Sequence, residues 1–174
     1  MSGGRFFLYW MLAFLGFPLG GFLAVLVVGS VEGVLFAALA GALAGSVIGA
    51  AQFLALRGRL GVGPAWILAT AFGLGLGNAI GATLTGAGTS IGALVVTGIA
   101  AGTAVGISQW ALLRRRVAAA ILWPPVVAVA WPIGWSVTWS IGVDVESGYA
   151  VFGASGALVF AAITGAAMLL LTRR

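Results

Sequence analysis

Six long apolar runs contain no charged residue, and this pattern excludes most folds. Each run is about 21 to 25 residues long, and they cover residues 6–28, 33–56, 64–84, 91–113, 117–141 and 149–171. As a helix rising about 1.5 Å per residue, each run crosses a hydrocarbon core of about 30 Å. Only 6% of the chain is charged, too little for a soluble surface. We expect an all-α integral membrane protein, with six transmembrane helices in one domain over 1–174.

A glycine-rich segment that ends in arginine recurs along the chain. Three glycines spaced four apart lead to Gln52 and then to arginines, and the same pattern returns 57 residues later around Gln109. At the same spacing, Tyr9 aligns with Trp66 and Trp123. A third, alanine-rich copy closes the chain and has Met168 in place of the glutamine. The sequence predicts three tandem two-helix hairpins with approximate bounds 5–59, 60–116 and 117–174, related by pseudo-threefold symmetry around the membrane normal.

Charge is segregated between the two sides of the predicted membrane. All arginines fall on one side, and the acids Glu32, Asp144 and Glu146 fall on the other. By the positive-inside rule we expect both termini to be cytoplasmic, in a multi-pass protein of the cell membrane. Five loop arginines are candidate contacts to anionic lipid headgroups, the expected membrane partners, or serve only as topology signals: Arg57, Arg59, Arg114, Arg115 and Arg116. No nucleic-acid partner is expected, because that requires a basic stripe on a soluble surface.

Small residues four apart predict close packing of the second helix of each hairpin, because small side chains let helix backbones approach in lipid. The expected packing positions are Gly41, Gly45, Gly49, Gly98, Gly102, Gly106 and Gly165. The first helix of each hairpin carries Pro18, Gly75 or Pro132 at matched depth, which predicts a break near the bilayer midplane. Such breaks either form ligand sites in transporters or are kinks that neighbouring helices tolerate.

Three carboxamides are the polar side chains of most interest. Gln52 and Gln109 continue the small-residue stripes, so we expect them to be buried and hydrogen-bonded to each other or to the backbone. Asn78 lies near the midplane. The three residues either join helices or form a candidate solute path: Asn78, Gln52 and Gln109. Among the aromatic residues, Tyr9 and Trp123 have positions typical of an interfacial belt.

The chain has no cysteine, histidine or lysine, and this absence excludes many kinds of chemistry. Disulfides, the usual zinc sites, iron–sulfur clusters and lysine Schiff bases all need one of these residues. Acid–base catalysis would depend on three loop carboxylates, and the serines have no side-chain base to activate them. We therefore predict no catalytic, cofactor-binding or metal-binding residue, no cofactor and no enzymatic activity.

Two functions fit this pattern. The leading hypothesis is a non-enzymatic accessory or self-associating component that acts through helix packing, with a second copy or another membrane subunit as its partner. The alternative is a small channel or transporter for an ion or a small uncharged solute. Continuous small-residue stripes favour the first hypothesis. A symmetry axis with an acidic outer mouth favours the second.

Reporter fusions test the topology. Reporters placed after Gly86 and after Ser147 should read as external, because arginine bias in short loops sets orientation and both loops lack arginine. A fusion after Arg174 should read as cytoplasmic and is the control. A cytoplasmic reading at either loop would contradict the predicted topology.

Overall fold

A computed structural model describes residues 1–142 and 154–172, and all regular structure in these ranges is helical. The elements are α1 (Gly3–Leu12), the 3₁₀ segment η1 (Ala13–Leu15), α2 (Gly16–Val28), α3 (Val34–Leu60), α4 (Ala65–Thr85), α5 (Ile91–Leu113), the 3₁₀ segment η2 (Ala120–Leu122), α6 (Trp123–Ser140) and α7 (Ala154–Leu171). Six stretches of the described chain are long and apolar enough to cross a membrane. Elements α1, η1 and α2 together form the first span, and η2 with α6 forms the fifth. This is the composition of a multi-pass membrane protein.

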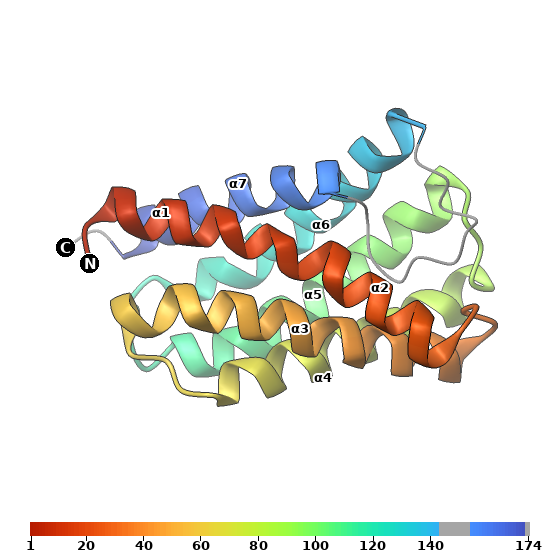
Figure 1. The fold of residues 1–174 in the computed structure, drawn as a ribbon, viewed down its shortest axis with the longest axis horizontal. Coiled ribbons are helices and arrows are strands. Elements are labelled where there is room, and N and C mark those ends of the chain that lie inside the picture. The colour runs from red at the N-terminus through yellow and green to blue at the C-terminus, as the bar shows by residue number, and fades with distance from the viewer. Residues whose placement is uncertain (143–153, 173–174) are drawn as a thin grey trace.

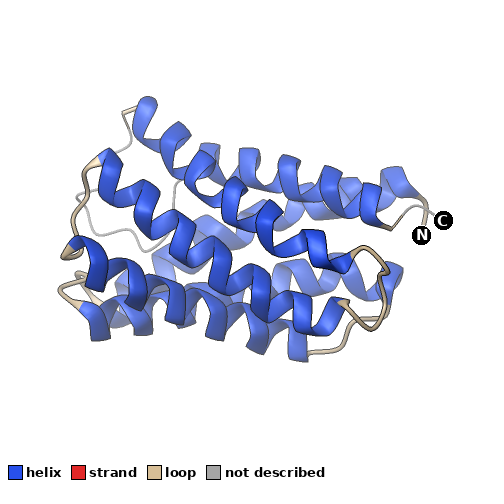
Figure 2. Cartoon of the chain, turned by 180° about the vertical axis from the view of Figure 1, so that it is seen from behind, coloured by secondary structure: helices blue, strands red, loops and turns tan. Residues whose placement is uncertain are grey.

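The six spans lie side by side and close into a ring. Each span packs against the next one along the chain, and α1 packs against α7 as well as α3, so the first and last spans meet. Figure 1 shows the two termini next to each other at one end of the bundle. Seen from behind, short connections link neighbouring helices at both ends (Figure 2). Short connections force successive helices to run in opposite directions.

Helix α3 extends beyond the apolar run that predicted it. The run ends at Leu56, whereas the helix continues to Leu60 and carries Arg57 and Arg59 in its last turn. Positive side chains are favourable there, because the carbonyl end of a helix is partly negative. Gly61 then ends the helix with a left-handed backbone (φ 60°), a conformation that glycine adopts without strain. The start of the sixth predicted run, together with Asp144 and Glu146, lies outside the described residues.

The predicted midplane break is present in the first span alone. Segment η1 interrupts it just before Pro18, which has no N–H and crowds the carbonyl four residues earlier, so the preceding turn tightens. At Gly75 and Pro132 the prediction of a break is wrong, since α4 and α6 stay α-helical through both positions. Gly75 keeps its backbone N–H. Pro132 packs tightly against Gly98 of α5: a Cβ added to Gly98 would lie 2.9 Å from the Cα of Pro132.

Trp10, and not Tyr9, occupies the buried side of the first span. The side chain of Trp10 is 2% exposed, whereas that of Tyr9 is 46% exposed. Trp66 and Trp123, with which Tyr9 aligns in sequence, are both buried. The prediction that Trp123 belongs to an interfacial belt is therefore wrong, because its indole lies inside the bundle.

Segment η1 accounts for this shift of one residue. Ten positions separate Trp10 from Gly20, and eleven separate Trp66 from Gly77. Each glycine packs against the backbone of an alanine in the following helix, so the two stretches end at similar helix contacts. Each 3₁₀ residue turns the chain by about 120° instead of about 100°, so three of them add about 60°. The stretch from Trp10 to Gly20 is one residue shorter than that from Trp66 to Gly77, and one α-helical residue would turn the chain by about 100°. The three 3₁₀ residues therefore supply most of that rotation.

The small-residue stripes face the next helix around the ring. A Cβ added at Gly41 would lie 2.7 Å from the carbonyl oxygen of Leu74 in α4, and one added at Gly102 would lie 2.5 Å from that of Val127 in α6. Gly45 and Gly49 meet α4, Gly98 and Gly106 meet α6, and Gly165 of α7 meets Phe7 and Trp10 of α1. Any side chain at these positions would collide with a neighbouring backbone or ring.

Alanine substitutions in α5 test this packing. Gly102→Ala should lower the melting temperature in detergent, because the new methyl group meets backbone atoms and overpacking costs about 1 to 3 kcal/mol. Gly92→Ala is the matched control, since the same helix leaves open space around Gly92. That change should be neutral or slightly stabilising, by up to about 1 kcal/mol. Equal melting of the two variants would contradict a close contact between α5 and α6.

Candidate functional site

The carboxamides of Gln52 and Gln109 meet inside the bundle. Gln52 belongs to α3 and Gln109 to α5, and both side chains are buried. Nε2 of Gln109 donates a hydrogen bond to Oε1 of Gln52 at 3.0 Å. The bond joins two helices that both pack against α4. The sequence predicts this contact, and it is present.

Two tryptophans determine the orientation of these amides. An indole N–H can only donate, so the amide group facing it must be an oxygen. Nε1 of Trp66 donates to Oε1 of Gln52 at 3.1 Å, and Nε1 of Trp123 donates to Oε1 of Gln109 at 2.9 Å. With both oxygens assigned in this way, the nitrogen of Gln109 is the group left to reach Gln52. The hydrogen bonds therefore run in one direction, from Trp123 through Gln109 to Gln52.

Thr70 is the fifth member of this cluster. Its hydroxyl accepts a second hydrogen bond from Nε2 of Gln109 at 3.0 Å and donates to the carbonyl of Trp66 at 2.9 Å. We call the cluster the Trp–Gln network; its members are Gln52, Trp66, Thr70, Gln109 and Trp123. All five side chains are buried, and they come from α3, α4, α5 and α6. The network links four of the six spans.

The remaining two spans are joined by a related bond. Nε1 of Trp10 donates to the hydroxyl of Thr164 in α7 at 3.0 Å, and that hydroxyl donates to the carbonyl of Phe160 at 2.7 Å. Met168, which replaces the glutamine in the third copy, is fully buried one turn further along α7. Since a thioether is a poor acceptor, the indole bonds to the threonine instead.

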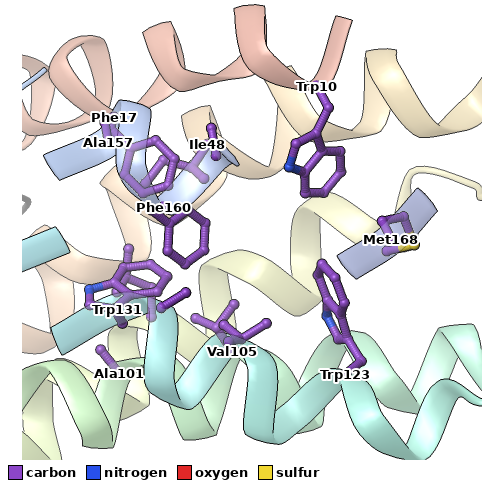
Figure 3. Close-up of a cluster of buried hydrophobic side chains, with 14 of the residues drawn as sticks. Trp10, Phe17, Ile48, Ala101, Val105, Trp123, Trp131, Ala157, Phe160 and Met168 are labelled. Atoms are coloured by element: carbon purple, nitrogen blue, oxygen red, sulfur yellow. The ribbon is translucent and has the colours of Figure 1, made fainter. Parts of the chain in front are cut away.

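Aromatic rings fill the interior on both sides of Gln52. In Figure 3, Trp10, Trp123 and Met168 lie close together, and Phe17, Trp131 and Phe160 form a second group. The rings of Trp10 and Trp123 meet edge to face at 6.1 Å between centroids. The rings of the second group are 5.0 to 5.9 Å apart.

A small void lies between the two aromatic groups. Its walls include Trp10, Phe17, Gln52 and Phe160, and it has no room for a water molecule.

The third carboxamide lies far from the other two. Asn78 is 9% exposed and sits against Gly41, eleven residues before Gln52 on α3, which at 1.5 Å per residue is about 16 Å away along the bundle. The three members of the predicted solute path therefore lie at two different depths of the bundle. Within the described ranges Asn78 makes no hydrogen bond, and the buried hydroxyl of Thr138 in α6 also lacks a partner. Both lie in the half of the bundle away from the arginines.

The sequence contained a signal for the network that periodicity did not reveal. Each glutamine precedes its tryptophan by 14 residues, once from Gln52 to Trp66 and once from Gln109 to Trp123. That spacing spans the turn between neighbouring hairpins, so it pairs the end of one helix with the start of the next. Thr70 and Thr164 carried no comparable signal, because threonine hydroxyls inside apolar helices usually bond to their own backbone.

The candidate headgroup arginines gather at one end of the bundle, which we call the arginine end. Arg57, Arg114 and Arg115 are exposed, and the guanidinium of Arg114 lies 5.5 Å from the ring centroid of Trp110. Arg59 and Arg116 line a common cleft. Within residues 1–142 and 154–172, no cluster of three His, Cys, Asp or Glu side chains forms that could hold a metal ion.

No protein-family model matches the chain, and neither does any curated protein or solved structure. Its function has to be inferred from its own residues and geometry.

A double-mutant cycle tests the Trp–Gln network. Trp123→Phe and Gln109→Met should each lower stability by about 1 to 3 kcal/mol, because each leaves a buried polar partner unpaired. The double variant should lose less than the sum, since it removes both groups of one bond. Thr83→Ala is the control, because that exposed hydroxyl bonds only to its own helix, and the change should stay within about 0.5 kcal/mol. Additive losses in thermal melts would show that the two side chains do not interact.

Proposed function

We propose that this chain is a non-enzymatic membrane component that acts through helix packing, as an accessory subunit or by self-association, and that it does not conduct. The observation that carries the proposal is that its buried polar side chains hydrogen-bond to one another. The amide oxygens of both buried glutamines already accept from indoles, and Nε2 of Gln109 already donates to Gln52 and Thr70, so these atoms are engaged within the bundle. Aromatic rings occupy the interior next to them.

The proposed architecture is three tandem hairpins around a pseudo-threefold axis, with both termini cytoplasmic. Three indoles support it, because each is hydrogen-bonded by the helix that precedes it around the ring: Trp10 by α7, Trp66 by α3 and Trp123 by α5. The contacts of the small-residue stripes follow the same order. The cytoplasmic assignment is supported by the arginines of the described chain, which lie at or next to the ends of helices on one side.

A catalytic role finds no support in these residues. The buried polar groups of the Trp–Gln network are amides, indoles and a hydroxyl, none of which exchanges protons readily near neutral pH. A buried hydrogen-bonded network specifies how helices fit together, because a wrong arrangement would leave several polar groups unpaired. Such specificity suits a protein whose task is to hold a defined shape in the bilayer.

A small channel or transporter remains the second candidate, and one observation favours it. Thr138 in α6 and Ser155 in α7 have buried hydroxyl oxygens without a hydrogen-bond partner in the described chain, and a polar solute would satisfy them. Transport would require the aromatic groups around Trp10 and Phe17 to separate.

Reconstitution of one double variant tests the two functions against each other. The parental protein in liposomes should show no flux of ions or small polar solutes above empty vesicles. Changing both Gln52 and Gln109 to Met should leave flux absent and lower the melting temperature, because the indoles of Trp66 and Trp123 lose their acceptors. Asn78→Leu is the companion variant. A parental flux that either set of substitutions abolishes would make transport the better conclusion.

A further inference from the structure

The arginine end of the bundle carries positive charge without a counter-charge. Five arginines lie at the ends of α3 and α5, and the chain continues past α7 into two more. Glu32 is the one acid among the described residues, and it lies at the opposite end, after α2. No arginine of the described chain forms an ion pair. Any charge compensation at this end must therefore come from outside these residues.

A cleft of about 740 Å³ opens at this end, where the three hairpins meet. Its walls come from the end of α3 at Arg59, from the segment after α5 at Arg116 and from the end of α7 at Thr172, together with Met1. Figure 1 shows that the ends of α1, α3 and α7 are close to one another there. Unlike the lipid-facing surfaces, most of this cleft is polar.

Arg59 is held in place by groups that leave its charge unpaired. Its Nε and one terminal nitrogen donate to the hydroxyl of Thr172, both at 3.0 Å, and the other terminal nitrogen reaches the carbonyl of Met1 at 3.4 Å. Its guanidinium lies 5.2 Å from the ring centroid of Phe6, which is fully buried. All these partners belong to other elements, so Arg59 is not a cap of its own helix. A half-buried guanidinium fixed in this way is preorganised to bind an anion.

Arg116 approaches the same cleft from a different hairpin. It donates to the carbonyl of Leu112, at the end of its own helix, and to the carbonyl of Gly61, after α3, at 3.3 and 3.5 Å. Both bonds are long and go to neutral acceptors, and a guanidinium has five N–H donors. Of the five N–H donors on each guanidinium, about two therefore remain on Arg59 and about three on Arg116.

We propose that this cleft is a binding site for a phosphate-bearing anion, which Arg59 and Arg116 hold together. Guanidinium groups recognise phosphate through paired, charge-assisted hydrogen bonds, and two of them on one cleft can bind different oxygens of one phosphate group. The hydroxyl of Thr172 orients Arg59. By joining residues from different hairpins, the bound anion fastens the arginine end of the ring. The site does not depend on whether the bundle conducts.

Two sources supply this chemistry at a membrane surface. The phosphate belongs either to the headgroup of an anionic phospholipid or to a soluble phosphate compound. The arginine end lies at the height where headgroups occur, because the helices that lead to it span the hydrocarbon core. Either source would bind to the same two arginines, so the same arginine variants test binding of both.

Binding is measured on the full-length protein in an uncharged detergent. Calorimetric titration with inorganic pyrophosphate tests the soluble source, and native mass spectrometry with phosphatidylglycerol, against phosphatidylcholine, tests the lipid source. Arg116→Gln should weaken binding of the effective probe at least about tenfold, because it removes a charge-assisted contact. Arg115→Gln is the matched control: it removes the same charge from the adjacent residue, which does not line the cleft, and should change binding less than about twofold.

Arg59→Gln should weaken binding similarly, and its melting curve shows whether losing the Thr172 contact also disturbs the fold. If Arg59→Gln disturbs the fold, Arg116→Gln still tests the proposal, because Arg116 is exposed. Pyrophosphate binding that phosphatidylglycerol does not displace identifies a soluble ligand. Selective retention of phosphatidylglycerol over phosphatidylcholine, lost in Arg116→Gln but kept in Arg115→Gln, identifies a headgroup. Equal losses in the Arg115 and Arg116 variants, or no binding of either probe, would overturn the site.

Discussion

The close approach of helix backbones at the small-residue stripes determines the rest of this structure. Inside a bilayer, apolar side chains gain little by leaving lipid for protein, so helices associate through tight packing and hydrogen bonds. Where Gly41 or Gly102 faces the next helix, no side chain stands between the backbones. The large rings are therefore placed on other faces of the helices. Trp10, Trp123 and Phe160 point inward and occupy the middle of the ring (Figure 3).

The inward indoles in turn explain the buried amides. A tryptophan inside a dry bundle needs an acceptor for its N–H, and a carboxamide can accept from the indole and still donate elsewhere. Gln109 does both, because it accepts from Trp123 and donates to Gln52 and Thr70. Glycine stripes, indoles and amides are thus successive consequences of one packing arrangement. In the Trp–Gln network, the buried polar side chains hydrogen-bond from one helix to another.

The sequence was sufficient for features that depend on periodicity and charge. Charge-free runs predicted the spans, and the placement of Gln52 and Gln109 on the small-residue stripes predicted that they would be buried and hydrogen-bonded, either to each other or to the backbone. Features that depend on contacts between distant segments were not predictable. Exposed Tyr9 and buried Trp10 are adjacent and equally aromatic, and the 3₁₀ turn of η1 decides between them. Helix α6 continues through Pro132, which lies against Gly98 of α5, and no local pattern encodes that contact.

The segment η1 also has a consequence for length. A 3₁₀ residue rises about 2.0 Å and an α-helical residue about 1.5 Å, so three of them lengthen the span by about 1.5 Å, the rise of one α-helical residue. The first span therefore reaches the same depth with one residue fewer between Trp10 and Gly20. A deletion inside a membrane helix would ordinarily shift everything beyond it in height and in direction. Here a single tightened turn offsets the difference of one residue, so the first span and α4 differ in residue number between their packed positions and still match in length.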